Sequence, residues 1–128
     1  GEKEMKKKYF KLTTEINGKQ FSYSTLTGIG LAEVEYSADK WTRAPEWLAK
    51  KGYHLFVFDD LQKAIKFANM SSPPIRLWEC EIRSKYKNLP VYLSRDEINK
   101  GRLVPVNGRF PEGTVMAREV KLTKKIWG

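Results

Sequence analysis

The most regular pattern of hydrophobic and polar positions lies in the sequence YHLFVFDDLQKAIKFA. Residues 53–58 form an apolar run broken only by His54, and such a run is typical of a strand that is covered on both faces. Apolar positions then recur at helical spacing, after an aspartate, Asp59, that we expect to cap the helix. The pattern predicts an interior strand over 53–58 and a helix over about 60–69, ended by the Ser-Ser-Pro-Pro segment that follows.

The predicted helix has a single apolar stripe. We expect this stripe to pack on the sheet, and it consists of Leu61, Ala64, Ile65 and Ala68. Lys63 and Lys66 lie outside the stripe, so we expect them to face away from the sheet. This is the arrangement of a helix that covers one face of a sheet.

Alternation of apolar and polar residues predicts most of the remaining strands. In KKYFKLTTEINGKQFSYS, two runs rich in aromatic and β-branched residues flank Asn17-Gly18, a dipeptide that favours a tight hairpin turn. Shorter alternating runs predict strands over 31–39, 75–84 and 114–126. A further short strand is expected at 91–93.

Two more short helices are predicted from the residues at their ends. Pro45 stands near a first helical turn, and Gly52 follows the two lysines that end that segment. Ser94 and Glu97 have the spacing of a capping box, and they open a helical turn that Gly101 closes.

Together these elements predict an α+β fold. We expect a single compact domain over residues 9–128, with a mainly antiparallel sheet and two or three short helices. Residues 1–8 are expected to form a flexible basic N-terminus. Within it, residues 1–4 are expected to be foreign to the natural chain, which would then start at Met5.

The charge balance indicates what kind of partner to look for. The chain of 128 residues has a formal net charge of +9, and residues 1–8 hold four lysines and two glutamates, so the domain itself keeps +7. A positive field of this size favours acidic partners, either nucleic acid or an acidic protein surface. It also keeps a protein soluble, and that explanation needs no partner.

The composition argues against several other classes of protein. The sequence has no apolar run of the roughly 20 residues that a membrane span needs, and its N-terminus lacks the apolar core of a signal peptide. One cysteine allows no internal disulfide and no cysteine-rich zinc site. We therefore expect a cytoplasmic monomer that binds no membrane, no metal and no cofactor.

His54, Cys80, Glu79 and Glu81 are the candidates for catalysis. With no second histidine to share a metal, a hydrogen-bonded structural role is the simpler interpretation of His54. Cys80 alternates with apolar residues and is expected to be a small buried hydrophobe. Glu79 and Glu81 form an E-x-E pair that could hold a cation or act as a general base, or they simply make one strand face polar. The sequence contains no P-loop, nucleophile elbow, zinc motif or dinucleotide fingerprint.

Three groups of basic residues with nearby aromatic rings are the candidates for binding. The first comprises Arg83, Lys85, Tyr86 and Lys87. The second, near Phe110, comprises Arg95, Lys100, Arg102 and Arg109. The third, near Trp127, comprises Arg118, Lys121, Lys124 and Lys125. Interleaved charges and rings fit single-stranded or structured nucleic acid better than groove reading, and a solvated rim is the alternative.

The segments GYHLFVFDDLQKAIKFA and IRLWECEI, with the ending GTVMAREVKL, resemble the layout of small ADP-ribosyltransferase-like domains, including phage-type ones. Such domains place a Gly-aromatic strand before a helix that ends in an aromatic-alanine pair, here Phe67-Ala68. The resemblance covers residues 52–83 and implies an enzyme that uses NAD. It implies Tyr53 or His54 at the nicotinamide side and a glutamate, from the pair at 79 and 81, at the ribose.

Two functional hypotheses follow. The favoured one is a small basic non-catalytic binding protein that engages nucleic acid or an acidic protein surface, of the kind that phages and mobile elements use to modulate host machinery. The alternative is an ADP-ribosyltransferase-like enzyme that uses NAD.

Overall fold

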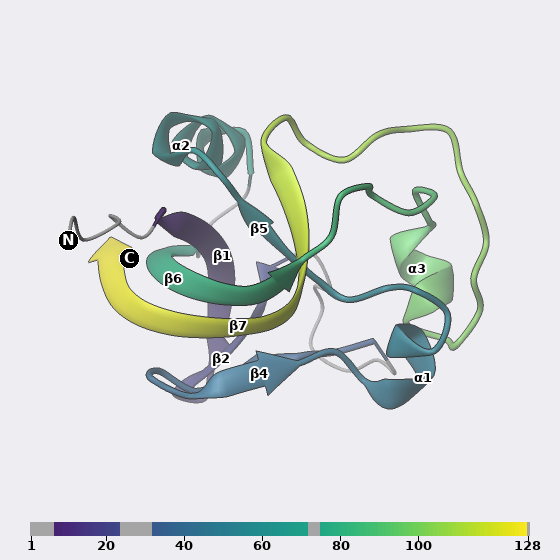
Figure 1. The fold of residues 1–128 in the computed structure, drawn as a ribbon, viewed down its shortest axis with the longest axis horizontal. Coiled ribbons are helices and arrows are strands. Elements are labelled where there is room, and N and C mark those ends of the chain that lie inside the picture. The colour runs from purple at the N-terminus through teal and green to yellow at the C-terminus, as the bar shows by residue number, and fades with distance from the viewer. Residues whose placement is uncertain (1–6, 24–31, 72–74, 128) are drawn as a thin grey trace, which may run out of the picture.

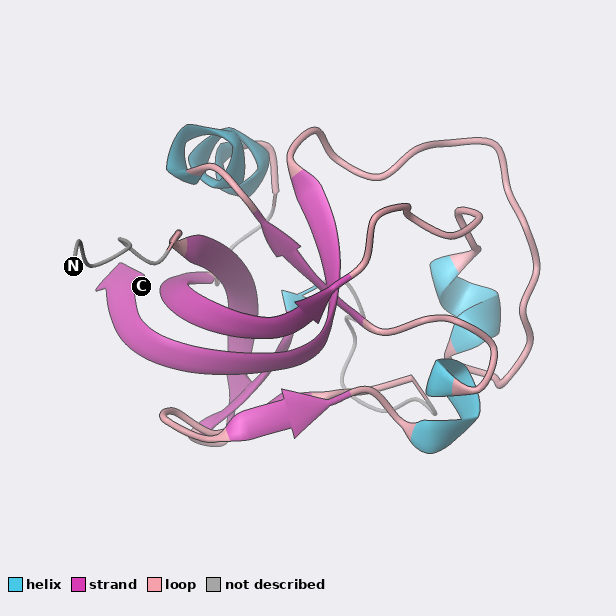
Figure 2. Cartoon of the chain, in the orientation of Figure 1, coloured by secondary structure: helices cyan, strands magenta, loops and turns pink. Residues whose placement is uncertain are grey.

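The computed structural model describes residues 7–23, 32–71 and 75–127, which form an antiparallel sheet with three short helices beside it (Figure 1). The strands are β1 (Tyr9–Ile16), β2 (Lys19–Ser22), β3 (Glu35–Tyr36), β4 (Trp41–Arg43), β5 (Leu55–Phe58), β6 (Arg76–Lys85) and β7 (Thr114–Trp127). The helices are α1 (Glu46–Ala49), α2 (Leu61–Asn69) and α3 (Arg95–Ile98). The predicted mainly antiparallel sheet with short helices is confirmed, and strand outweighs helix in the described residues, as Figure 2 shows.

Four strands of the sheet close into a ring. β1 pairs with β5, β5 with β7, β7 with β6, and β6 pairs back with β1. β2 and β3 extend the sheet beyond β1, while β4 pairs with β7. The ring gives each of its four strands a partner on both sides, which leaves fewer free edges than an open sheet would have.

The ring closes because β6 and β7 are long and curved, as Figure 1 shows. Their pairing contains two register shifts, one after Leu77 and one after Glu79. Irregularities of this kind bend a strand and increase its twist. The bend lets β7 pair with β5 near Thr114 and with β6 as far as Trp127.

The hydrophobic core has two parts, which lie on opposite faces of β1. Alternation along β1 assigns Tyr9 to the first part and Phe10 to the second. The first, which we call the ring core, contains Tyr9, Val34, Tyr36, Leu55, Val57, Cys80, Val115, Ala117, Val120 and Leu122. The second, which we call the helix core, contains Phe10, Leu12, Phe58, Ala64, Ala68, Ile75 and Leu77.

Helix α2 covers the helix core as the apolar stripe predicts. Ala64 and Ala68 are buried, while Leu61 and Ile65 are half-buried and pack against the same cluster. The small buried alanines let the helix lie close to the sheet. The predicted helix is therefore confirmed, and its larger apolar side chains lie at the margin of the core.

The residue that caps α2 is Asp60, one position later than predicted. The Asp60 carboxylate accepts a hydrogen bond from the Lys63 backbone N–H at 3.0 Å. Asp59 is still held by the sheet, because its backbone N–H donates to the Gly113 carbonyl at 2.9 Å. The prediction of Asp59 as the cap is wrong for this reason.

Strand β5 is an interior strand, as predicted, since it pairs with β1 and with β7. It begins at Leu55, however, and not at Tyr53. The Tyr53 N–H donates to the Leu48 carbonyl at 3.0 Å, so this residue completes the end of α1, just after the predicted stop at Gly52. His54 lies between the helix end and the strand.

The predicted hairpin and the predicted cap of α3 are confirmed. Asn17 has φ 53° and Gly18 has φ 80°, so both adopt the left-handed conformation that a mirror-image two-residue turn requires. The Ser94 hydroxyl accepts a hydrogen bond from the Glu97 N–H at 3.3 Å and starts α3.

Two strand predictions need correction, and one strand was not predicted. Of the predicted strand 31–39, residues 32–39 are described, and only Glu35–Tyr36 is strand among them. The segment 91–93 makes a single bridge, between Leu93 and Pro105. Trp41–Arg43 is a strand that the sequence pattern did not predict. These short segments owe their conformation to distant pairing, as when β4 pairs with β7, and local alternation is too brief to reveal it.

Some predictions fall outside the described residues. They are the N-terminal residues 1–6, which include the four expected to be foreign, and residues 72–74, which were expected to end α2. Across the described ranges, no helix is long and apolar enough to cross a membrane.

Candidate binding pocket

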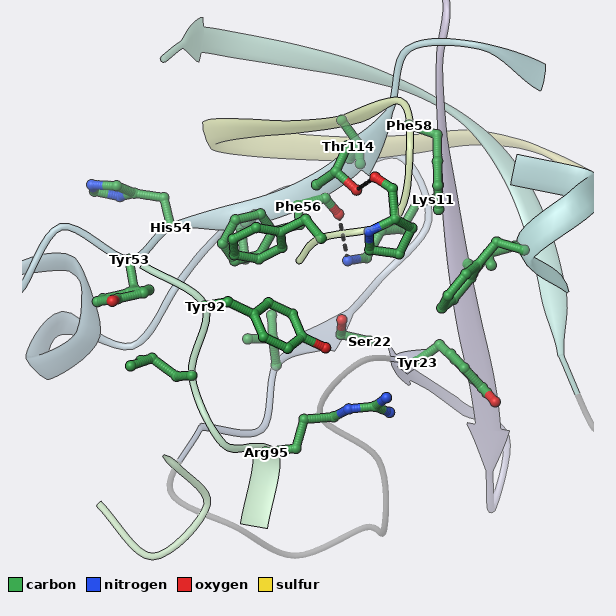
Figure 3. A pocket seen from close by; sticks show the side chains of 18 of the residues that line it. Lys11, Ser22, Tyr23, Tyr53, His54, Phe56, Phe58, Tyr92, Arg95 and Thr114 are labelled. Atoms are coloured by element: carbon green, nitrogen blue, oxygen red, sulfur yellow. Dashed lines mark hydrogen bonds between the residues drawn. The ribbon is translucent and has the colours of Figure 1, made fainter. Parts of the chain in front are cut away.

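A pocket of about 540 Å³ lies over β1 and β5 and is bordered by residues of all three helices (Figure 3). The segments that border it are distant in the sequence, from Lys11 on β1 to Thr114 at the start of β7. A volume of this size is typical of sites that enclose a small organic ligand.

Aromatic rings form much of the pocket wall. The rings of Phe56 and Phe110 stack with centroids 4.8 Å apart, and Tyr92 meets Phe110 edge-on at 5.1 Å. The Tyr53 hydroxyl donates to the Val91 carbonyl at 2.9 Å, which ties the start of β5 to the segment that leads to α3. These contacts fix a hydrophobic surface on which another flat ring can stack.

Gly108 makes room for the Tyr92 ring. A Cβ atom at Gly108 would lie 2.9 Å from Cε2 of the Tyr92 ring, and Gly108 has φ 150°. A side chain at this position would push the Tyr92 ring out of place. The glycine therefore shapes the pocket wall.

Lys11 brings an ammonium group to the pocket, where Figure 3 shows its side chain. The residue is only 5% exposed. Its Nζ donates to the Phe56 carbonyl at 2.6 Å and lies 5.4 Å from the centre of the Tyr36 ring. Burial lowers the pKa of Lys11 from 10.5 to about 8, and the Cys80 thiolate would act in the opposite direction. Within the described residues, no carboxylate forms an ion pair with Lys11.

Positive charge also dominates the rest of the pocket border. Besides Lys11, the border includes Lys63, Lys66, Arg95 and Arg109. The one acidic residue among the described residues of the border is Glu112, whose carboxylate lies 3.6 Å from the Lys63 ammonium group. Among residues 7–23, 32–71 and 75–127, no ion pair involves the remaining cations, which are Lys11, Lys66, Arg95 and Arg109. Lys63 and Lys66, which were expected only to face away from the sheet, thus border the pocket.

Arg95 and Arg109 come from the second predicted basic group and lie at the pocket. Figure 3 shows the Arg95 side chain among the residues that line the pocket, which also include Tyr92 and Tyr23. Lys100 and Arg102 of the same group do not border the pocket. Arg102 pairs with Glu97 at 2.5 Å and so steadies the end of α3.

The first predicted basic group is divided between several contacts. Tyr86 stacks on His54, with ring centroids 4.5 Å apart and an angle of 13° between the planes. Arg83 lies over the Trp41 ring at 3.9 Å and pairs with Glu119 at 4.0 Å. Lys85 and Lys87 are exposed on the surface. One face of the Tyr86 ring is therefore already occupied.

The third group lies along β7. Lys121 pairs with Glu81 at 3.2 Å and lies 5.1 Å from the centre of the Trp41 ring, so its charge is partly balanced. Arg118 is exposed near His54, in a smaller hollow that also contains Tyr86. Lys124 and Lys125 are exposed near the end of the strand.

The candidate catalytic residues do not share one site. His54 borders the pocket, and its pKa is lowered by burial and by the nearby Arg118. Its expected side-chain hydrogen bond does not occur among the described residues, where stacking on Tyr86 holds the ring. Glu79 and Glu81 lie outside the pocket border, and Glu79 pairs with Lys8 at 3.5 Å.

Cys80 is a buried hydrophobic residue, as predicted. It is 2% exposed within the ring core, and burial raises the pKa of its thiol to about 12. A thiol in this state is a poor nucleophile. Within the described ranges, no three histidine, cysteine, aspartate or glutamate residues gather closely enough to hold a metal ion.

Comparison of the chain with protein-family models, curated proteins and solved structures found no match. The geometry of the pocket and the chemistry of its residues are therefore the basis for assigning a function.

Sequence reasoning did not identify Lys11 as a binding residue. The available signal was its place in the run YFKLTT, where apolar or β-branched residues surround a single lysine. Phe56 and Tyr92 were missed because aromatic residues of this kind are more often part of the core.

Proposed function

We propose that this protein is a non-catalytic nucleic-acid-binding protein that takes one nucleotide of a single strand into the pocket. The observation that carries the proposal is the combination of aromatic walls and unbalanced positive charge around a single cavity. We further propose that it acts as a monomer in the cytoplasm.

The aromatic wall supplies the part of the site that would hold the base. A base that enters beside Tyr92 and Phe110 meets ring faces and edges already held in place by Phe56. Stacking of one base on an aromatic side chain contributes about 1–3 kcal/mol and tolerates any sequence. The wall therefore favours recognition of an unpaired base, without strong preference for its identity.

The cations at the border supply the part that would hold the phosphates. Arg95, Arg109 and Lys66 have no ion-pair partner among the described residues, so they are available to phosphate oxygens. Arginine binds phosphate through two parallel N–H···O hydrogen bonds, and this geometry suits a nucleic-acid backbone that passes the pocket mouth. A base in the pocket and its phosphates at the border account for both features at once.

Nucleic acid fits the pocket better than the other partners considered. An acidic protein surface offers carboxylates for the cations, but it lacks the flat ring that a nucleotide carries beside its phosphate. An NAD-using transferase needs a glutamate at the ribose, whereas the only glutamate among the described residues of the border is Glu112, beside Lys63. Glu79 and Glu81 lie outside it.

Titration of labelled single-stranded DNA and RNA across a salt series tests the proposal. If about three phosphates are bound, log Kd should rise with log salt with a slope of about 2. Arg95→Ala should weaken binding several-fold and lower that slope by about 0.7, because it removes one phosphate contact.

Lys124→Ala is the matched control, since Lys124 is an exposed cation that does not border the pocket. It should change affinity much less than Arg95→Ala. Binding that does not respond to salt, or equal losses in the two variants, would contradict the proposal. Binding of polyglutamate in place of the oligonucleotides would indicate an acidic protein partner.

A further inference from the structure

The nucleotide site leaves one chemical group of the pocket unexplained. Lys11 carries a primary amine that is buried among apolar side chains, yet it borders a cavity that a ligand can enter. A surface lysine would bind phosphate without the cost of burial, so the position of this amine calls for a different explanation.

We propose that Lys11 captures carbonyl compounds, its amine forming a reversible imine with an aldehyde that enters the pocket. This goes beyond nucleic-acid binding and does not depend on it. The ligand class is a flat aromatic aldehyde that carries an anionic group, because the pocket offers rings for the flat part and Arg95 for the charge.

The reaction needs no further reactant. The lone pair of the neutral amine attacks the carbonyl carbon, and proton transfer from nitrogen to oxygen gives a carbinolamine. Loss of water then forms the carbon–nitrogen double bond, so amine and aldehyde become imine and water. Hydrolysis reverses each step, which makes the capture reversible.

The surroundings of Lys11 favour this chemistry. The hydrogen bond of 2.6 Å to the Phe56 carbonyl holds Nζ in one position. Such a bond uses one N–H and leaves the lone pair of the neutral amine available. No carboxylate within the described residues pairs with Lys11 to hold it in the ammonium form. Burial, which lowers its pKa to about 8, increases the neutral fraction.

Trapping with pyridoxal 5′-phosphate and borohydride tests the inference on the unmodified full chain. This probe is an aromatic aldehyde with a phosphate group, and borohydride supplies the hydride that reduces the imine to a stable secondary amine. Peptide mapping by mass spectrometry then gives the labelling rate of each lysine. Exposed lysines such as Lys87 and Lys124 provide internal controls in the same sample.

Labelling of Lys11 should be at least about tenfold faster than labelling of the exposed lysines at pH 8. The reason is that an amine with a pKa near 8 is about half neutral at that pH, whereas an ordinary lysine is less than about 1% neutral. The rate should rise with pH and level off above about 8. Lys11 labelling no faster than that of Lys87 and Lys124 would overturn the inference.

Lys11→Arg keeps the positive charge but cannot form this imine, so the trapped adduct at position 11 should be absent, while labelling of the surface lysines should stay unchanged. Labelling of Lys11 and binding of oligonucleotides test imine formation and the nucleic-acid function separately. Lys11 labelling without oligonucleotide binding would contradict only the nucleic-acid function, and oligonucleotide binding without selective labelling would contradict only imine formation.

Discussion

Lys11→Met is expected to change the free energy of unfolding by an amount that depends strongly on pH. In the folded protein the pKa of Lys11 is lowered by burial to about 8, whereas an unfolded lysine has a pKa near 10.5. Between these values the unfolded chain binds more protons than the folded one. The stability contributed by this residue therefore rises with pH, by about 1.4 kcal/mol per unit, through the window from about 8 to 10.5.

The methionine variant lacks this titration. Its stability relative to the wild type should be most favourable at pH 7 and should fall by about 2–3 kcal/mol by pH 10. Loss of the hydrogen bond to the Phe56 carbonyl changes the stability of the variant relative to the wild type by a similar amount at pH 7 and at pH 10. The change in relative stability between the two pH values therefore reports on the buried charge. Urea denaturation of both proteins from pH 7 to pH 10 measures it.

Lys124→Met provides the control, since Lys124 is exposed near the end of β7. The free energy of unfolding of Lys124→Met should change with pH in the same way as that of the wild type. If the Lys11→Met difference were also constant from pH 7 to pH 10, the charge of Lys11 would not be buried as described.

Ile65→Ala is the second large effect, and we expect it to destabilise the protein by about 2 kcal/mol. Full truncation of a buried aliphatic side chain costs about 2–5 kcal/mol, and the half-buried position of Ile65 puts it at the low end of that range. Lys66→Ala, one residue along the same helix, removes an exposed side chain and should cost almost nothing. Thermal and urea unfolding of the two variants would show the contrast.

An Ile65→Ala variant that melts like the wild type would contradict the packing of α2 on the helix core. A large loss in Lys66→Ala would do the same, because it would mean that the helix buries its other face. Lys66→Ala also has a separate expected effect on oligonucleotide binding, since Lys66 borders the pocket.

Elements whose signals are local could be predicted from the sequence. The Asn17-Gly18 turn, the Ser94 cap and the apolar stripe of α2 each depend on residues within a few positions of one another. Elements that depend on distant pairing could not be predicted. β4 is a strand because it pairs with β7, and the exact start of β5 is set by a hydrogen bond from Tyr53 to α1.

The candidate site divides in the same way. Arg95 and Arg109 could be predicted as binding residues, because the pattern of basic residues near aromatic ones is visible in the sequence. Lys11 and Phe56 become neighbours only because β1 and β5 lie side by side in the closed ring. Ion pairs such as Lys121 with Glu81 likewise decide which cations are balanced, and no local pattern reveals that.

Photochemical crosslinking tests the central claim, that a nucleotide occupies the pocket, most directly. A single-stranded oligonucleotide that contains 5-iodouracil would be irradiated with the protein, and the crosslinked peptides would be mapped by mass spectrometry. We predict crosslinks at the aromatic residues of the wall, chiefly Tyr92 and Phe110, and their loss when unlabelled oligonucleotide competes. Crosslinks confined to Trp41 or Trp127, which lie outside the pocket, or no crosslink at all, would contradict the account.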